Sequence, residues 1–427
     1  MSMLTHVKQA WRLMLANKLF SAIYVSGTSL AIATTTLFAV IYYVKIAPMY
    51  PETNRSDTYY FKTVQWFNPA RGMTIQSRLG YDLVKDHLYN LKTATHVSAT
   101  YAMWDPQIYV THPETRRDIK IETRMTDPAY FEIYPYRFIE GAAFTDEDLS
   151  SGRLVAVITD DVARRLYGTD KGLIGKPVTI NHREFTIVGV IEPGSSLLQD
   201  SYAEVIIPYT TQSGYDDQRT QFIGQLAVTM TAPDGDALRE EIAEIARKRN
   251  SSQDEYEVSF FDFPKSHFAT AVNPDKVEQD VSWQAIVRQN LLVLFVLLLV
   301  PALNLSGLIS SRMEMRSAEI GVRRSFGATR PGLLGQVLWE NLVLTVIGGL
   351  VGLIIVWLSL WVTGGSLLTL MNQNVSSSAT SAALTSGILF APAIFIIVFI
   401  FCFILNVLSA LIPAWLSIRK QITTCLK

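Results

Sequence analysis

The chain has 427 residues, a formal net charge of −1 and a hydrophobic fraction of 49%. The near-neutral charge argues against nucleic acid as a partner, because a nucleic-acid-binding face is strongly basic. The two cysteines, Cys402 and Cys425, both lie close to the C-terminus. The rest of the chain therefore holds no disulfide framework and no cysteine-based metal site.

The first two predicted elements are an amphipathic helix and a membrane span. In residues 1–18, apolar side chains recur at helical spacing and basic ones lie on another face. This pattern is typical of a helix at a membrane interface, which could serve as a plain anchor or take part in coupling. Residues 19–44 are apolar over the length that crosses a bilayer. They are too long for the apolar core of a signal peptide, so we expect a retained span.

Four segments reach membrane-spanning length, which predicts four transmembrane helices at residues 19–44, 289–311, 333–361 and 387–416. Lysine and arginine gather before the first span, in residues 312–332 and in residues 417–427, whereas residues 362–386 carry no charge. Because basic loops stay inside, both termini and residues 312–332 are predicted to be cytoplasmic. The predicted fold class is a membrane protein with four transmembrane α-helices. A large extracytoplasmic α+β domain, residues 45–288, is inserted between the first and second.

Residues 45–288 alternate strand and helix patterns. Strands are predicted at 59–67, 97–103, 107–110, 117–125, 154–158, 178–180, 185–191, 204–208, 226–231 and 256–262, and helices at 76–91, 160–168 and 234–249. Asp160 is the predicted cap of the second helix and Gly168 its stop, while Asn181–Arg183 is the predicted turn of a hairpin. We interpret the whole as an α+β unit interrupted by a mostly-β insertion at about residues 135–215.

The sequence shows no arrangement of catalytic side chains. Residues 172–177, "GLIGKP", lack the first glycine and the final serine or threonine of a phosphate loop. The six histidines lack metal-ligand spacing, so we interpret them as ordinary surface or turn residues. The predicted spans carry no charged residue at their centres, which weakens the hypothesis of a proton-coupled carrier. The one acid within a predicted span, Glu340, lies near the cytoplasmic end of the third. We therefore predict a non-catalytic subunit with no metal or cofactor of its own, powered by a partner.

The segment "EIGVRRSFGATR", residues 319–330, together with the span after it, closely resembles the MacB/FtsX family of ABC-transporter permeases. That family's pattern is Glu-Ile-Gly-x-Arg-Arg, then Gly-Ala-x-Arg, then a span with Gly-Gly-x-x-Gly. The matching positions here are Glu319, Ile320, Gly321, Arg323, Arg324, Gly327, Ala328, Arg330, Gly348, Gly349 and Gly352. The resemblance implies an FtsX-like permease domain at about residues 289–420. Three stretches of the outer domain within residues 130–192 also resemble the MacB-type periplasmic core domain.

The resemblance implies that residues 312–332 form a hinge that couples to an ATPase. Apolar Ile320 and Val322 within a basic helix suit docking in a partner's groove, and Gly321 and Gly327 allow close approach and a turn. Lipid-headgroup contact alone would explain the arginines but not the glycines and Glu319. Because only eighteen residues precede the first span, we expect a separate cytoplasmic ABC ATPase to bind ATP and Mg.

The resemblance also implies a pair of permeases, from two copies or from two related chains. Gly27, Ala31 and Thr35 place small side chains in one stripe of the first span, and Gly348 and Gly352 form a stripe in the third. Small stripes let helices approach closely in lipid. We predict that the first stripe contributes to the dimer seam and that the second packs within the subunit, although the first stripe could also pack within the chain.

The resemblance implies a function in a bacterial inner membrane with the large domain in the periplasm. The expected activity is mechanotransmission: ATP hydrolysis by the partner moves the periplasmic domain. The expected output is export of a drug, peptide or lipid-like substrate, with a periplasmic adaptor and outer-membrane channel as further partners. Two alternatives stay open, which are FtsX-like signalling to a cell-wall hydrolase and release of lipoproteins.

Overall fold

The computed structural model describes residues 18–102, 108–216, 223–251, 256–260, 263–272, 322–323 and 325–363, with isolated positions between 284 and 292 and between 395 and 415. The predicted N-terminal helix and C-terminal tail lie outside the described residues. So do the second and fourth spans and the loop at 362–386, apart from isolated positions. The chain divides into two compact units. We call them the helical unit (Met1–Tyr43, Trp283–Leu367 and Ser386–Lys427) and the sheet unit (Val44–Ser282 and Leu368–Thr385).

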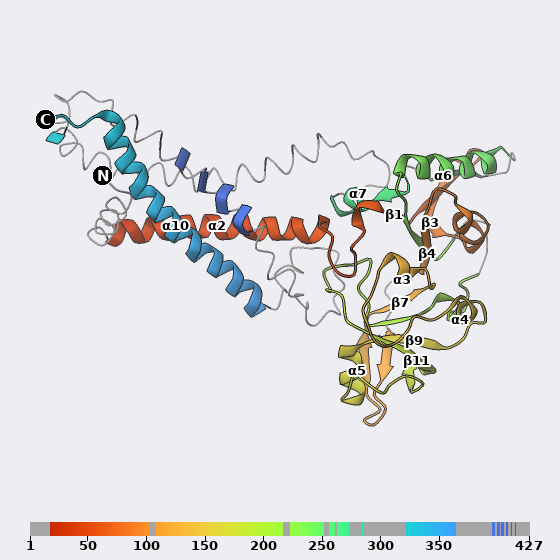
Figure 1. The fold of residues 1–427 in the computed structure, drawn as a ribbon. Helices are drawn as coiled ribbons and strands as arrows, with labels where there is room; N and C mark the ends of the chain where they lie inside the picture. Colours follow the sequence, from red (N-terminus) through yellow and green to blue (C-terminus); the bar gives the residue numbers. More distant parts are fainter. Residues whose placement is uncertain are drawn as a thin grey trace. The chain divides into compact units, whose positions relative to one another are not determined.

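Two long helices dominate the described part of the helical unit: α2, Lys18–Ile46, and α10, Arg330–Thr363 (Figure 1). Within them, Ser21–Ile46 and Asn341–Val362 are long and apolar enough to cross a membrane, with mean hydropathies of 1.6 and 2.5. These two stretches overlap the predicted first and third spans. The boundary between the units falls inside α2, so its last turn belongs to the sheet unit.

Helices α2 and α10 pack closely because α10 offers glycines at the contact. A Cβ atom added to Gly352 would lie 2.6 Å from the carbonyl oxygen of Ser29, which a real side chain could not tolerate. The hydroxyls of Tyr24 and Thr345 share a hydrogen bond of 3.1 Å. The residue numbers of the contacting pairs increase together along both helices. The pairs are Tyr24 with Thr345, Thr28 with Gly348, and Ser29 with Gly352. The two helices therefore run parallel.

The sheet unit is built on strands that join into one continuous path, β15-β2-β3-β14-β4-β7-β12-β9-β11-β10-β5-β6. Its first part contains β1 (Thr58–Phe61), β2 (Val64–Asn68), β3 (Met73–Leu79), β4 (His96–Tyr101), β13 (Ile223–Gly224), β14 (Leu226–Thr231), β15 (Glu257–Ser259), β16 (Lys265–Ser266), α6 (Gly235–Asn250) and α7 (His267–Val272). Strand β1 pairs antiparallel with both β14 and β16. The buried side chains of Leu238 and Ile242 place one face of α6 in the core shared with these strands.

The second part of the sheet unit lies between β4 and β13 in the sequence. It contains β5 (Ile108–Thr111), β6 (Asp118–Ile121), β7 (Thr123–Thr126), α3 (Tyr130–Ile133), β8 (Phe138–Gly141), α4 (Asp146–Ser150), β9 (Val155–Thr159), α5 (Asp160–Tyr167), β10 (Pro177–Ile180), β11 (Arg183–Ile191) and β12 (Val205–Pro208). Strands β9 and β11 are parallel, with α5 in the connection between them, and β8 pairs with β11. Strand β7 joins the two parts, since it pairs with β12 and β4.

Several predicted elements are confirmed with their local causes. The hairpin turn has positive φ at Asn181 (43°) and His182 (63°), as a two-residue turn of the favoured hand requires. Gly168 ends α5 in the left-handed conformation, with φ of 71°. The helix cap is Thr159 instead of the predicted Asp160: its side chain accepts from the Val162 amide, and Asp160 is the first helical residue.

The predicted helix at 76–91 is wrong at its start. Residues 73–79 form β3, which pairs with β2, and the helical turns begin at residue 81 and include Leu83–His87 and Leu88–Asn90. Two predicted strands are wrong in extent. The strand at 59–67 divides into β1 and β2, which pair with different neighbours, and the strand at 117–125 divides into β6 and β7. Of the predicted strand at 256–262, residues 256–260 are described, and Glu257–Ser259 of these form β15.

Candidate functional site

The described part of the hinge, from residue 322 onward, contains a helical turn, a glycine and the start of α10. The Phe326 amide bonds the Val322 carbonyl at 3.1 Å, and the Ala328 amide bonds the Arg323 carbonyl at 3.0 Å. Gly327 follows with φ of 91°, a conformation in which an L side chain is strained. The Thr329 hydroxyl then accepts from the Gly332 amide at 3.3 Å, in the position of a helix cap. The predicted glycine turn is therefore present, and α10 begins at Arg330.

Part of the predicted coupling set lies in the described hinge. Arg323 donates from Nη1 to Oε1 of Gln336 at 2.9 Å, which ties the turn to α10. The Val322 side chain is 47% exposed and the Phe326 side chain 88% exposed. Sequence reasoning did not select Phe326, although a phenylalanine in a charged hinge is a signal for a contact surface. The predicted coupling residues outside the described part of the chain are Glu319, Ile320, Gly321 and Arg324.

The predicted packing residues lie in two different environments. Gly348 and Gly352 contact α2 of the same chain. Ala31 and Thr35 are buried, at 8% and 3% exposure, whereas a Cβ on Gly27 would meet nothing within 4 Å. The chain itself therefore covers two members of the predicted dimer stripe. Only its Gly27 end is open, and the dimer seam stays a prediction.

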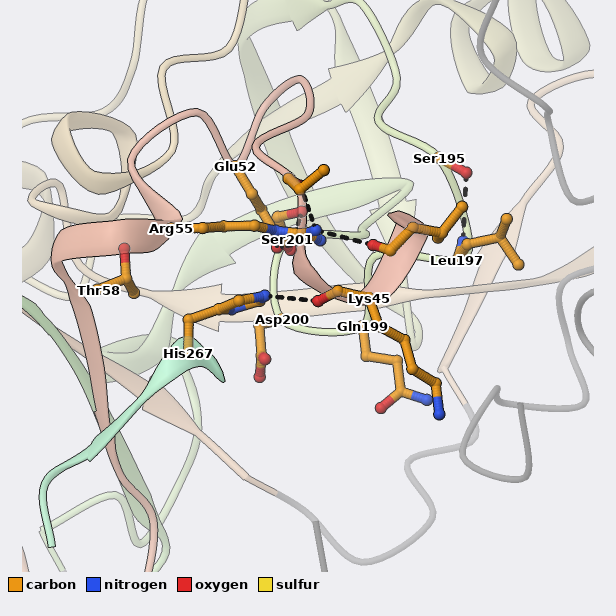
Figure 2. Close-up of polar contacts among 12 residues, drawn as sticks. Lys45, Glu52, Arg55, Thr58, Ser195, Leu197, Gln199, Asp200, Ser201 and His267 are labelled. Atoms are coloured by element: carbon orange, nitrogen blue, oxygen red, sulfur yellow. Dashed lines mark hydrogen bonds and ion pairs between the residues drawn. The ribbon is translucent and has the colours of Figure 1, made fainter. Parts of the chain in front are cut away.

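A second polar site surrounds the C-terminal end of α2. The last carbonyls of a helix have no partner within it and attract cationic donors. Arg55 lies in a short 3₁₀ helix (Arg55–Asp57), the next helical element after α2, and is 6% exposed. Its Nη1 donates to the carbonyl of Val44 at 2.8 Å and to that of Ala47 at 2.6 Å (Figure 2).

The charge of Arg55 is balanced by Glu52, which is 3% exposed. Nε and Nη2 of Arg55 both lie 2.7 Å from one carboxylate oxygen of Glu52. The other carboxylate oxygen accepts from Oγ of Ser201 at 2.7 Å. A buried ion pair is tolerated when its remaining polar atoms find partners, and this pair meets that condition on both sides.

His267 supplies a further contact to the same helix end. Its Nε2 lies 2.9 Å from the carbonyl oxygen of Lys45, and its Nδ1 lies 2.9 Å from the hydroxyl of Tyr60. A carbonyl only accepts, so Nε2 carries the proton and Nδ1 accepts from Tyr60. Burial, and then the positive charge of Arg55, lower the pKa of His267 below its usual 6.5. The ring is therefore neutral at pH 7.

The loop that carries Ser201 is held rigidly in turn. The hydroxyls of Tyr130 and Tyr136 both donate to the Ser201 carbonyl. The neighbouring Asp200 pairs with Nζ of Lys62 at 2.6 Å. We call Glu52, Arg55, Ser201 and His267, with the carbonyls that they hold, the α2 anchor. It fastens the last turn of α2 to β1, to this loop and to α7 of the sheet unit.

The α2 anchor has the properties of a mechanical joint. Its side chains form hydrogen bonds and ion pairs with one another and with backbone carbonyls. Among the residues that the structure describes, no group of three or more His, Cys, Asp and Glu side chains could hold a metal ion. Sequence reasoning missed the anchor: His267 was interpreted as an ordinary surface or turn residue, yet its side chain is buried at 6% exposure.

Two family models match the chain. The model described as MacB-like periplasmic core domain matches residues 21–248, and the FtsX-like permease C-terminal model matches residues 291–422. The uncharacterized ABC transporter permease YknZ of Bacillus subtilis (strain 168) is 26% identical over 52% of this chain and 53% of its own length. The macrolide export ATP-binding/permease protein MacB of Burkholderia pseudomallei (strain 1710b) is 25% identical over 61% of this chain and 40% of its own. The chain thus spans about half or less of these relatives.

Two solved structures align with part of the chain. The periplasmic region of MacB from Actinobacillus actinomycetemcomitans aligns with a TM-score of 0.34 and 16% identity, covering 50% of this chain and 94% of that one. The extracellular domain of the noncanonic ABC-type transporter YknZ aligns with a TM-score of 0.32 and 20% identity, covering 46% and 99%.

Proposed function

Because the chain belongs to the MacB/FtsX family of ABC-transporter permeases, we propose that it converts ATP-driven movement of a separate cytoplasmic ATPase into movement of its periplasmic domain. The observation that carries this proposal is the α2 anchor. Helix α2 is uninterrupted from Lys18 to Ile46. The carbonyls of Val44 and Lys45 in its last turn, and that of Ala47 just after it, are bonded to side chains of the sheet unit. A shift or rotation of α2 would therefore be applied directly to that unit.

The parallel packing of α2 and α10 supports the proposed topology. Two parallel helices in one membrane start on the same side, so the chain between them must cross back once. The apolar segment at residues 289–311 has the length for this return. A fourth span at residues 387–416 then brings the C-terminus back to the cytoplasm, where the basic segments are expected. We propose four spans in the bacterial inner membrane, with both termini on its cytoplasmic side.

The hinge is the proposed docking surface for the ATPase. Val322 and Phe326 are exposed on a turn that Arg323 ties to α10, and α10 packs on α2 through Gly348 and Gly352. Aromatic anchors on a charged surface frequently dominate binding energy. These contacts offer a continuous route from the hinge to the α2 anchor along described residues. The cargo proposed is a drug, peptide or lipid-like molecule taken up outside the cytoplasm, handed to an adaptor and outer-membrane channel.

The proposal is tested with the full chain and its ATPase in nanodiscs. We expect ATP to change hydrogen exchange in the sheet unit, and Phe326→Ala to abolish this change and weaken ATPase binding about tenfold or more, as for a binding hot spot. Phe67→Ala, at a phenylalanine 39% exposed on β2, is the matched control and should change neither.

Two results would contradict the proposal. One is an ATP-dependent response of Phe326→Ala equal to that of the parent chain. The other is transport of substrate from the cytoplasmic side across a single bilayer by the purified pair, because that would make the spans a conduit instead of a transmission element.

A further inference from the structure

His267 joins the two ends of the sheet unit that lead toward the membrane. Its Nε2 holds the carbonyl of Lys45 in the last turn of α2 (Figure 2). The residue is itself the first of α7, the last described element before the chain returns to the helical unit. The preceding strand, β16, pairs with β1, which carries Tyr60. One buried side chain therefore fastens the entry and the exit of the sheet unit to each other.

The contacts of His267 require a neutral ring. Nδ1 accepts from the Tyr60 hydroxyl, so a second proton on Nδ1 would place two donors against each other unless the hydroxyl turned to accept. Tyr60 is 1% exposed, and its hydroxyl also neighbours the buried hydroxyl of Tyr134. Protonation would therefore force the Tyr60 hydroxyl to turn away from its present geometry at Nδ1 and would bury a charge.

The charged groups around His267 come from every element packed against it. Arg55, from the short 3₁₀ helix after α2, disfavours a second positive charge, whereas Glu52 and Asp200 favour it. From β16, Lys265 directs its ammonium group over the Phe263 ring, 5.2 Å from the ring centre. The carboxylate of Glu52 is already committed to Arg55 and Ser201. Together with burial, these groups leave the pKa of His267 lowered, so the neutral ring is favoured in the closed junction.

We propose that His267 is a pH-sensitive lock on the α2 anchor, closed when the ring is neutral and released when acid outside the cytoplasm protonates it. The released junction exposes the ring to water, where it binds a proton more readily. Stability conferred by the lock is complete above the ordinary histidine pKa of 6.5 and is lost as the pH falls through the lower pKa of the closed junction. The consequence for transport rests on the proposed function: an acid exterior would loosen the joint through which α2 moves the sheet unit.

Hydrogen exchange of the full chain in nanodiscs, without ATPase or ATP, tests the lock directly. Rates in peptides covering residues 44–60 and 263–272 are measured between about pH 5 and 7.5, the range in which histidine titrates, and corrected for intrinsic exchange. We expect protection to fall on acidification, because the released junction binds a proton more readily than the closed one. A flat profile in the parent chain would overturn the proposal.

Variants separate the lock from other titrations. His267→Gln offers an amide that can donate to Lys45 and accept from Tyr60, so we expect protection at pH 7.5 with no loss on acidification. His267→Ala should be unprotected throughout. His182→Asn, at an exposed histidine in the β10–β11 turn, should keep the pH dependence. An acid-dependent loss in His267→Gln equal to that of the parent chain would assign the titration to another group.

Tyr60→Phe gives a second test that does not depend on how well glutamine fits. Removing the hydroxyl that donates to Nδ1 withdraws support from the neutral ring, so the midpoint of release should move to higher pH. An unmoved or lowered midpoint would contradict the lock. The measurement needs no ATPase, so a failure of the proposed function, seen as absence of ATP-driven movement, is distinguishable from a failure of the lock.

Discussion

Replacing Arg55 by alanine is the most direct test of the α2 anchor. The variant leaves the Glu52 carboxylate buried without its cation and frees the carbonyls of Val44 and Ala47. Breaking a buried ion pair by removing one partner costs about 3–5 kcal/mol, since the remaining charge is uncompensated. In a domain of this size, 1 kcal/mol lowers the melting temperature by about 2–4 °C. We therefore expect the sheet unit of Arg55→Ala to melt roughly 6–20 °C lower.

The assay is thermal unfolding of the full chain in detergent, followed by near-ultraviolet circular dichroism. Arg247→Ala is the matched control, because Arg247 pairs with Glu240 at 2.6 Å and Glu244 at 3.0 Å but is 57% exposed. An exposed pair contributes about 0–1 kcal/mol. If Arg55→Ala lost no more than Arg247→Ala, the anchor would not be a rigid joint.

Three further predictions address packing, titration and assembly. Gly352→Ala should destabilise the helical unit by about 1–3 kcal/mol, because its Cβ would lie 2.6 Å from the Ser29 carbonyl, whereas Gly335→Ala, with nothing within 4 Å, should be neutral or stabilising in the same melting assay. Burial raises the pKa of Asp127 from 3.8 to about 6, so its contribution to the free energy of unfolding, about 3 kcal/mol, is complete below pH 3.8 and is lost as the pH rises through about 6. Urea titrations of Asp127→Asn across this range should lack that slope, and a slope equal to the parent's would refute the assignment. Cysteine at Gly27, in a chain without its native cysteines, should cross-link two copies under oxidation. Cross-linking at Ile354, an exposed position of α10, but not at Gly27 would place the dimer seam on α10.

Elements with strong local signals could be predicted from the sequence. Asp234 caps α6 by accepting from the amides of Asp236 and Ala237, and the apolar spacing after it follows the helical period. The β10–β11 hairpin follows from Asn181 and its neighbours. Strand β3 could not be recognised, because its residues are mostly exposed or half-buried and lack the alternation that marks a strand with one buried face.

The hinge and the α2 anchor likewise differ in how well the sequence predicts them. The hinge can be recognised from the sequence because glycine and arginine occur together in one short segment. Gly327 adopts the turn that this composition predicts. The α2 anchor gives no such local signal. His267 meets the Lys45 carbonyl across 222 positions of sequence, and the partner atom is backbone, which has no residue type to recognise. Phe326 was passed over because one apolar residue among arginines forms no period.

The hydroxyl groups of α2 have a consequence for how the protein is made. Thr34, Thr35 and Thr36 donate to carbonyls one turn earlier in the same helix, and Ser26 and Ser29 do likewise. Helix α2 leaves the ribosome almost 300 residues before α10, so it must enter the lipid before its packing partner exists. Because these hydroxyls donate to carbonyls of their own helix, they are not left as unsatisfied polar groups in the lipid during that interval. The hydrogen bond between the hydroxyls of Tyr24 and Thr345 can form only after α10 has been synthesised.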